Sequence, residues 1–124
     1  MSAIIVGAGA LVATLLAPAP LPLAILEPAF QNTIVSTYPD GKSTKLWLER
    51  NGQYEALRAN GQRTGGSWQM KGDRLCMTQR RPIFVPLAFC TGIPSLKGGV
   101  GVSWTAKGLK GEPVRHTVVA GRGS

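Results

Sequence analysis

Short runs of alternating apolar and polar residues fill the chain from residue 32 onwards, and turn signals separate them. The separators are Pro39-Asp40-Gly41, Asn51-Gly52, Asn60-Gly61 and Lys71-Gly72-Asp73. Their spacing of about ten residues is typical of a β-meander, and Asn-Gly favours two-residue hairpin turns because Gly adopts positive φ freely. We therefore expect eight strands, at Asn32–Tyr38, Ser43–Glu49, Gln53–Arg58, Gly66–Met70, Arg74–Gln79, Ile83–Cys90, Val100–Lys107 and Glu112–Ala120.

Alternation within these runs assigns one set of side chains to the interior. Trp47 points the other way, and His116 shares the inward face with Val114 and Val118. An open sheet of eight strands would expose an apolar face and two edges. We therefore expect an all-β fold, a small antiparallel β-meander that closes into a barrel or a two-sheet sandwich. The expected interior residues are Leu46, Leu48, Tyr54, Ala56, Trp68, Met70, Leu75, Met77, Val100, Val102, Trp104, Ala106, Val114 and Val118.

The first 26 residues contain no Asp, Glu, Lys or Arg. The apolar run Ala3–Ala17 ends before Pro18 and is shorter than the roughly 20 residues that a membrane-spanning helix needs. This pattern favours a secretory signal with a small-x-small site at Ala17-Pro18-Ala19; an uncleaved anchor and a buried apolar segment are the alternatives. We expect a signal peptide (or anchor) with a Pro-rich end at 1–26 and one small β domain at 27–124.

The chain has two cysteines, Cys76 and Cys90, 14 positions apart. An even count in a small chain with an export signal predicts an intramolecular disulfide, which would contribute about 3 kcal/mol to stability in the chain-entropy model. Two buried free thiols are the alternative. Neither cysteine has a CxxC partner and His116 is the only imidazole, so we expect no metal and no cofactor.

Several turns form a series that resembles a known group of proteins. Asp40-Gly41 precedes Asn51-Gly52-Gln53-Tyr54, then Gly66-Ser67-Trp68, then Gly72-Asp73-Arg74-Leu75-Cys76. This order, from Asn32 to Cys90, is similar to the "DG…NGxY…GxW…GDxLC" series of small exported bacterial β-barrel proteins that are lipocalin-like. The resemblance implies a closed antiparallel barrel, a periplasmic or cell-envelope location and a binding or accessory role. It implies no functional residues, because the matched positions are turn and core positions.

The chain offers few groups for acid/base catalysis. It has one His and six acidic residues, of which Asp40 and Asp73 belong to turns. Glu49 and Glu55 flank a predicted hairpin turn beside arginines, where a solvated surface is expected. No GxSxG motif or Cys-His spacing nominates a nucleophile. We therefore expect a protein without enzymatic activity.

Charge is distributed unevenly. The formal net charge is +8; residues 27–57 carry three basic and four acidic residues, net −1, and residues 58–124 carry eleven and two, net +9. Such a surface attracts anions over about 10 Å at ordinary salt. For an exported protein these are lipopolysaccharide, phospholipid headgroups or polysaccharide, and nucleic acid is disfavoured because no recognition helix is predicted. The expected anion-binding residues are Arg74, Arg80, Arg81, Lys97 and Lys107.

Two functional hypotheses follow. The first is a non-catalytic, periplasmic or secreted cell-envelope protein that binds an anionic or amphipathic ligand or surface. The alternative is a structural or accessory protein that docks on another envelope protein through the apolar residues Ile83, Phe84, Val85, Leu87 and Phe89. An inhibitor of host lysozyme is disfavoured, because such lysozymes are themselves basic. The deciding observation is whether the barrel holds an unfilled cavity or is plugged by Trp68, Trp104, Tyr54 and Met70.

Overall fold

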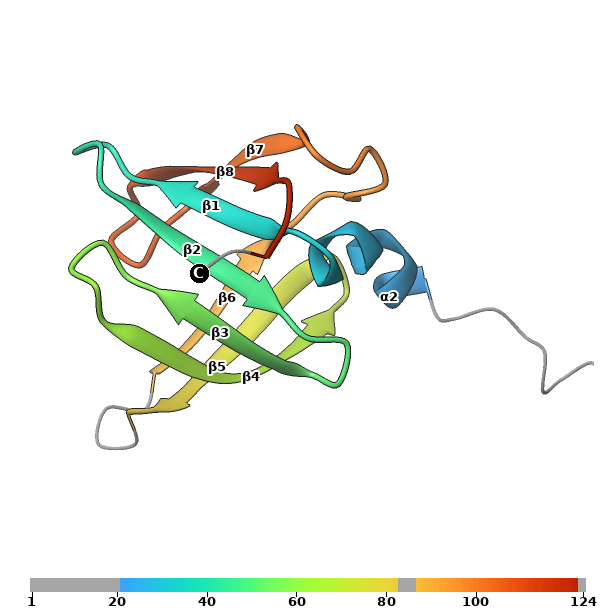
Figure 1. The fold of residues 1–124 in the computed structure, drawn as a ribbon, viewed down its shortest axis with the longest axis horizontal. Coiled ribbons are helices and arrows are strands. Elements are labelled where there is room, and N and C mark those ends of the chain that lie inside the picture. Colours follow the sequence, from blue (N-terminus) through green and yellow to red (C-terminus); the bar gives the residue numbers. More distant parts are fainter. Residues whose placement is uncertain (1–20, 83–86, 123–124) are drawn as a thin grey trace, which may run out of the picture.

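Eight antiparallel strands form one sheet in the computed structural model, which describes residues 21–82 and 87–122 (Figure 1). Two short helical segments precede the sheet, α2 (Leu21–Leu26) and the 3-10 turn η1 (Glu27–Phe30). The strands are β1 (Thr33–Thr37), β2 (Ser43–Leu48), β3 (Gln53–Leu57), β4 (Arg63–Lys71), β5 (Arg74–Arg81), β6 (Leu87–Gly92), β7 (Ser103–Lys107) and β8 (Pro113–Val119).

The strands follow one another around a nearly closed barrel. Neighbours in sequence pair from β1 to β6, β7 pairs with β8, and β8 returns to pair with β1. The sheet ends at β6 and β7, which lack a ladder between them, so a single seam separates these two edges. The expected all-β antiparallel fold is confirmed, in its barrel form.

The hairpin turns differ from the predicted two-residue type. Among the described residues only glycines adopt positive φ, Gly52 (+89°) and Gly61 (+87°) among them. At the β2–β3 turn the Gly52 amide donates to the Glu49 carbonyl (3.1 Å) and the Glu49 amide donates to the Gln53 carbonyl (2.8 Å). This is a three-residue turn ending in a left-handed glycine. Asn51 stays at negative φ because its side chain accepts the Gln53 amide (3.1 Å) instead.

Each predicted strand has a counterpart, with one clear error at the start of β7. The sequence predicts Val100 inside a strand, whereas Val100 lies in the preceding loop and is 56% exposed. Gly99 (+73°) and Gly101 (+97°) adopt positive φ on either side of it, and this interrupts an extended chain. The predicted strand segment Ile83–Pro86 lies outside the described residues.

Strand β4 begins at Arg63, before the predicted start at Gly66, so Gly65 also belongs to it. The register with β5 shifts between these two glycines. A Cβ on Gly66 would lie 1.9 Å from the Thr78 carbonyl oxygen, and one on Gly65 would lie 2.1 Å from Arg81 Nη2. Gly66 is therefore required by the close approach of the β5 backbone, whereas the backbone contact of a Cβ on Gly65 would be with the Tyr54 carbonyl oxygen of β3, at 2.9 Å.

The core fills the end of the barrel that α2 and η1 cover. Leu26 and Ala29 are buried there, and the Leu96 amide donates to the Ile25 carbonyl (2.8 Å). These helical residues reach back into the segment 1–26 that the sequence assigns to a signal; residues 1–20 of that segment lie outside the described residues. The other buried residues of this cluster are Ile34, Leu48, Tyr54, Trp68, Leu75, Ile93, Leu96 and Val118.

The chain after β8 crosses the same end of the barrel, where Arg122 forms hydrogen bonds to η1 and β2. Arg122 Nη1 donates to the carbonyl oxygens of Ala29 (3.3 Å), Phe30 (3.1 Å) and Leu48 (3.1 Å). Its Nη2 pairs with Glu49 Oε2 at 2.5 Å. A single guanidinium therefore connects η1, β2 and the last described residues.

Trp47 points away from the interior, as predicted, yet it is buried. Its indole N–H donates to Thr33 Oγ1 (2.8 Å), and that hydroxyl donates to the Gly121 carbonyl (2.7 Å). The guanidinium of Arg63 lies 5.9 Å from the ring centroid. The outer face of the barrel thus has a small covered region of its own.

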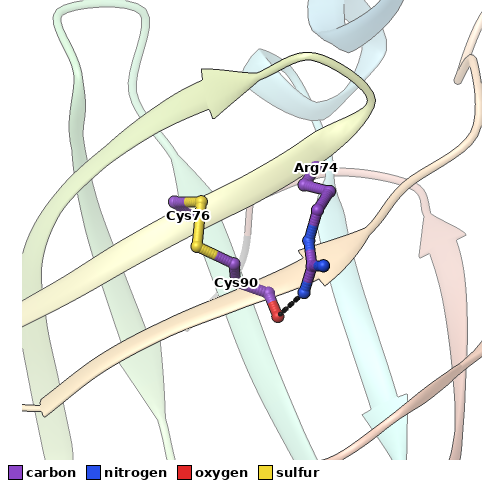
Figure 2. Close-up of a disulfide and its surroundings, with 3 residues drawn as sticks. All are labelled: Arg74, Cys76 and Cys90. Atoms are coloured by element: carbon purple, nitrogen blue, oxygen red, sulfur yellow. Dashed lines mark hydrogen bonds between the residues drawn. A yellow bond between two sulfur atoms is a disulfide. The ribbon is translucent and has the colours of Figure 1, made fainter.

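Cys76 and Cys90 form a disulfide, which confirms the predicted pairing (Figure 2). The two residues are opposite each other in the β5–β6 register, with Cα atoms 4.0 Å apart. Arg74 Nη2 donates to the Cys90 carbonyl (3.1 Å) beside the bond. Both contacts hold the edge strand β6 against β5.

Candidate functional site

The two ends of the barrel are built differently. The hairpins β1–β2, β3–β4 and β7–β8 surround one end, which we call the mouth, and α2 and η1 cover the other, which we call the closed end (Figure 1, left and right). Residues of all three hairpins, Asp40, Asn60 and Lys110 among them, line one shallow depression at the mouth.

A cavity of about 190 Å³ lies inside the barrel and extends toward the mouth. Both seam strands contribute to its wall, through Phe89 of β6 and Trp104 of β7. Trp68 packs in the closed-end cluster, so the tryptophans do not plug the interior. The apolar residues that line the cavity include Ile34, Leu46, Ala56, Leu75, Met77 and Val114.

One wall of the cavity is polar. Ser36 Oγ and His116 Nδ1 are 2.8 Å apart, and the rings of Trp104 and His116 stack with centroids 5.2 Å apart. Burial lowers the pKa of His116 below its usual 6.5, so the imidazole is neutral at pH 7. Among the described residues, Trp104 Nε1 is a buried donor without an acceptor. This wall can form hydrogen bonds to a guest but supplies no charge.

Positive charge appears where the cavity opens. Arg58 and Lys107 line the cavity near the mouth, and neither forms an ion pair within the described residues. Tyr54 lies deeper; its pKa is raised by burial, against the opposing effect of Arg58 and Arg81, so its hydroxyl keeps its proton at pH 7.

Most carboxylates are already engaged. Glu27 pairs with Arg50, Glu49 with Arg122 and Glu55 with Arg81. Asp40 and Glu112, the two acidic residues in the mouth hairpins, accept backbone amides of their own turns at 2.9 Å. Among the described residues, Arg58 and Lys107 thus form no ion pair with a carboxylate.

The structure divides the five predicted anion-binding residues between the two ends. Arg80 and Arg81 end β5 and Lys107 ends β7, next to the mouth. Arg74 begins β5 at the closed end, and Lys97 lies in the closed-end loop before β7. Arg80 Nε donates to Ser67 Oγ (3.2 Å) on the outer face. Only Lys107 of the five lines the cavity.

Arg58 is a mouth residue that the sequence analysis missed. Its position continues the inward alternation of Tyr54 and Ala56 by one more step. This alternation could have identified Arg58 as an inward-facing residue. Because Arg58 is the last residue of the predicted strand, it is easily counted as part of the exposed basic surface instead.

The apolar patch of the alternative hypothesis is described only in part. Leu87 and Phe89 both line the cavity, and Leu87 is 37% exposed at the mouth. Ile83, Phe84 and Val85 lie outside the described residues. The described part of the patch therefore belongs to the cavity wall.

The described residues hold neither a metal-binding cluster nor a membrane-spanning helix. Residues 21–82 and 87–122 contain no group of three or more His, Cys, Asp or Glu side chains arranged to hold a metal ion. In the same ranges, no helix combines the length and apolar character needed to cross a membrane.

The fold and the cavity together define a nearly closed, eight-stranded, up-and-down β-barrel with an internal cavity directed at one end. Comparison of the chain with protein-family models, with curated proteins and with solved structures returned no match.

Proposed function

We propose that the protein is an exported, non-catalytic cell-envelope protein that holds a small amphipathic molecule inside its barrel. The unfilled cavity of about 190 Å³ carries this proposal. A dry apolar cavity of about 150 Å³ is known to hold benzene, so there is room here for a ring or chain of roughly six to eight heavy atoms. The lipocalin-like series of turn motifs favours the same kind of function.

The distribution of polar groups favours an amphipathic guest with an anionic end. Apart from its basic residues, the cavity wall is apolar or carries uncharged polar groups, Ser36 and His116 among them. A charge buried there without a partner would be costly. Of the basic residues that line the cavity, Arg58 and Lys107 lie beside the opening, and the third, Lys45, is itself exposed to solvent. The apolar part of the guest therefore lies inside and its anionic group stays at the mouth.

Two features support export to the periplasm or beyond. Disulfides persist in oxidising compartments, and the Cys76–Cys90 bond is formed in the structure. The uncharged N-terminal segment has the composition of a secretory signal. Because Leu26 is buried in the closed-end core, cleavage at Ala17-Pro18-Ala19 keeps α2 in the mature protein, whereas cleavage after residue 26 would remove it.

A cavity-filling substitution tests the binding site. Ala56→Leu adds volume to the cavity wall, and hexanoate binding measured by calorimetry is expected to weaken at least about tenfold as the apolar chain loses contact area. Ala88→Leu is the matched control, since Ala88 is exposed on β6 and does not line the cavity. Equal affinity of the two variants and the wild type would overturn the proposed cavity site.

A charge substitution tests the orientation of the guest. Arg58→Gln is expected to weaken hexanoate binding about two- to fivefold, the upper part of the range for an exposed ion pair, while hexanol binding stays unchanged. Lys71→Gln, an exposed change at the closed end, should affect neither probe. Equal loss for hexanoate and hexanol would contradict an anionic group at the mouth.

A further inference from the structure

The charge of the barrel is concentrated at the mouth. Nine basic and three acidic residues lie in the mouth hairpins or in the adjoining parts of the strands, net +6, against five basic and three acidic elsewhere, net +2. The basic residues of the mouth are Lys42, Lys45, Arg58, Arg63, Arg80, Arg81, Lys107, Lys110 and Arg115, and the acidic ones are Asp40, Glu55 and Glu112.

Exposed apolar side chains occur within this cationic region. Leu109 is 61% exposed in the β7–β8 turn, between Lys107 and Lys110. Leu87 begins β6, and both leucines line the cavity where the seam meets the mouth. Val100, the other large exposed apolar residue of the described chain, lies at the closed end. The mouth thus combines protruding apolar groups with flanking cations.

We propose that the mouth is a docking face for an anionic phospholipid bilayer. Lysine and arginine side chains near such a surface are attracted to its headgroups, and an adjacent apolar side chain gains by entering the acyl boundary. A leucine at a hairpin tip with a lysine on each side fits this geometry. A bilayer needs no shape complementarity, whereas a stable protein partner would need a larger exposed surface than two leucines provide.

Docking in this orientation would place the opening of the cavity against the lipid. An amphipathic guest could then pass between bilayer and barrel without crossing bulk water. The docking inference rests on surface charge and exposure alone, so it stands or falls independently of the proposed cavity ligand.

Vesicle binding by paired charge variants tests the docking face. The protein is purified after export of the full chain, and binding to phosphatidylglycerol-containing and pure phosphatidylcholine vesicles is measured by sedimentation. Lys107→Gln with Lys110→Gln is expected to weaken binding to the anionic vesicles about 25-fold, about fivefold for each charge. Lys71→Gln with Lys97→Gln removes the same charge from the closed end, beyond the screening length of about 10 Å, and should change binding less than about twofold.

A second pair of variants tests the apolar contact. Leu109→Ser is expected to weaken binding to the anionic vesicles about tenfold, whereas Val100→Ser, an equally exposed change at the closed end, should leave it unchanged. All variants share the same sequence before residue 21 and are processed in the same way, so differences between them report on the barrel alone. Equal losses from both ends would indicate adsorption by charge without a defined face. That result, or binding that ignores the anionic lipid, would overturn the inference.

Discussion

Replacement of Trp68 by alanine is expected to destabilise the barrel by about 3–5 kcal/mol, the usual cost of deleting a buried tryptophan. The ring is 8% exposed within the closed-end cluster and lies 5.8 Å from the ring of Phe30. Its indole N–H donates to the Glu49 carbonyl (2.8 Å), and this hydrogen bond would be lost. Since small domains have only about 5–15 kcal/mol of stability, the urea midpoint should fall sharply.

Trp104 provides the comparison for this experiment. It is only partly buried, belongs to an edge strand and lines the cavity. The sequence predicts a similar cost for both tryptophans, but the structure leads us to expect a smaller loss for Trp104→Ala than for Trp68→Ala. An unchanged melting temperature for Trp68→Ala would contradict the closed-end core described above.

Replacement of Cys76 and Cys90 by serine is expected to lower the free energy of unfolding by about 3 kcal/mol, because the bond closes a short loop in the unfolded chain. The loop spans 14 positions. Strand β6 has a ladder neighbour only in β5, so the loss should loosen the seam side of the cavity as well. Thermal melting of the double variant measures the first effect.

A reductant supplies the matched control for the disulfide. Reduction should bring the melting temperature of the wild type to that of the double variant and should leave the variant unchanged. Two free thiols in the mass of the exported protein would show that the bond does not form in the cell.

The strands were predictable because local chemistry specifies them. Asn51 and Asn60 each accept the amide two residues on, and the glycine after each adopts positive φ. Once the strands were located, the inward-facing residues could be predicted at most strand positions, since the side-chain period of a strand is two. The exceptions have local causes: glycines on either side of Val100 interrupt the chain, and β4 extends back to Arg63 through Gly65, a residue of low strand propensity.

The candidate site was less predictable from the sequence. In a barrel, the end of the strand at which a charged residue lies decides where its charge appears, and charged residues close together in sequence can lie at opposite ends. Arg74 and Arg80 are six positions apart, which along β5 is about 20 Å, and they lie at opposite ends of the molecule. The apolar, uncharged composition of residues 1–26 predicts a signal segment, but composition alone does not reveal whether part of such a segment packs against a barrel. Only the packed structure places Leu26 in the core.

The pairing of β1 with β8 sets a condition on how the protein is made. Thr33 donates to the Gly121 carbonyl across 88 positions, and β1 finds its second neighbour only in residues 113–119. Such distant pairing is slow and comes late in folding. The barrel therefore cannot form its β1–β8 ladder before β8 has been synthesised. For a chain exported as proposed, this delay keeps the barrel open through most of translation, while it is still to be threaded across a membrane.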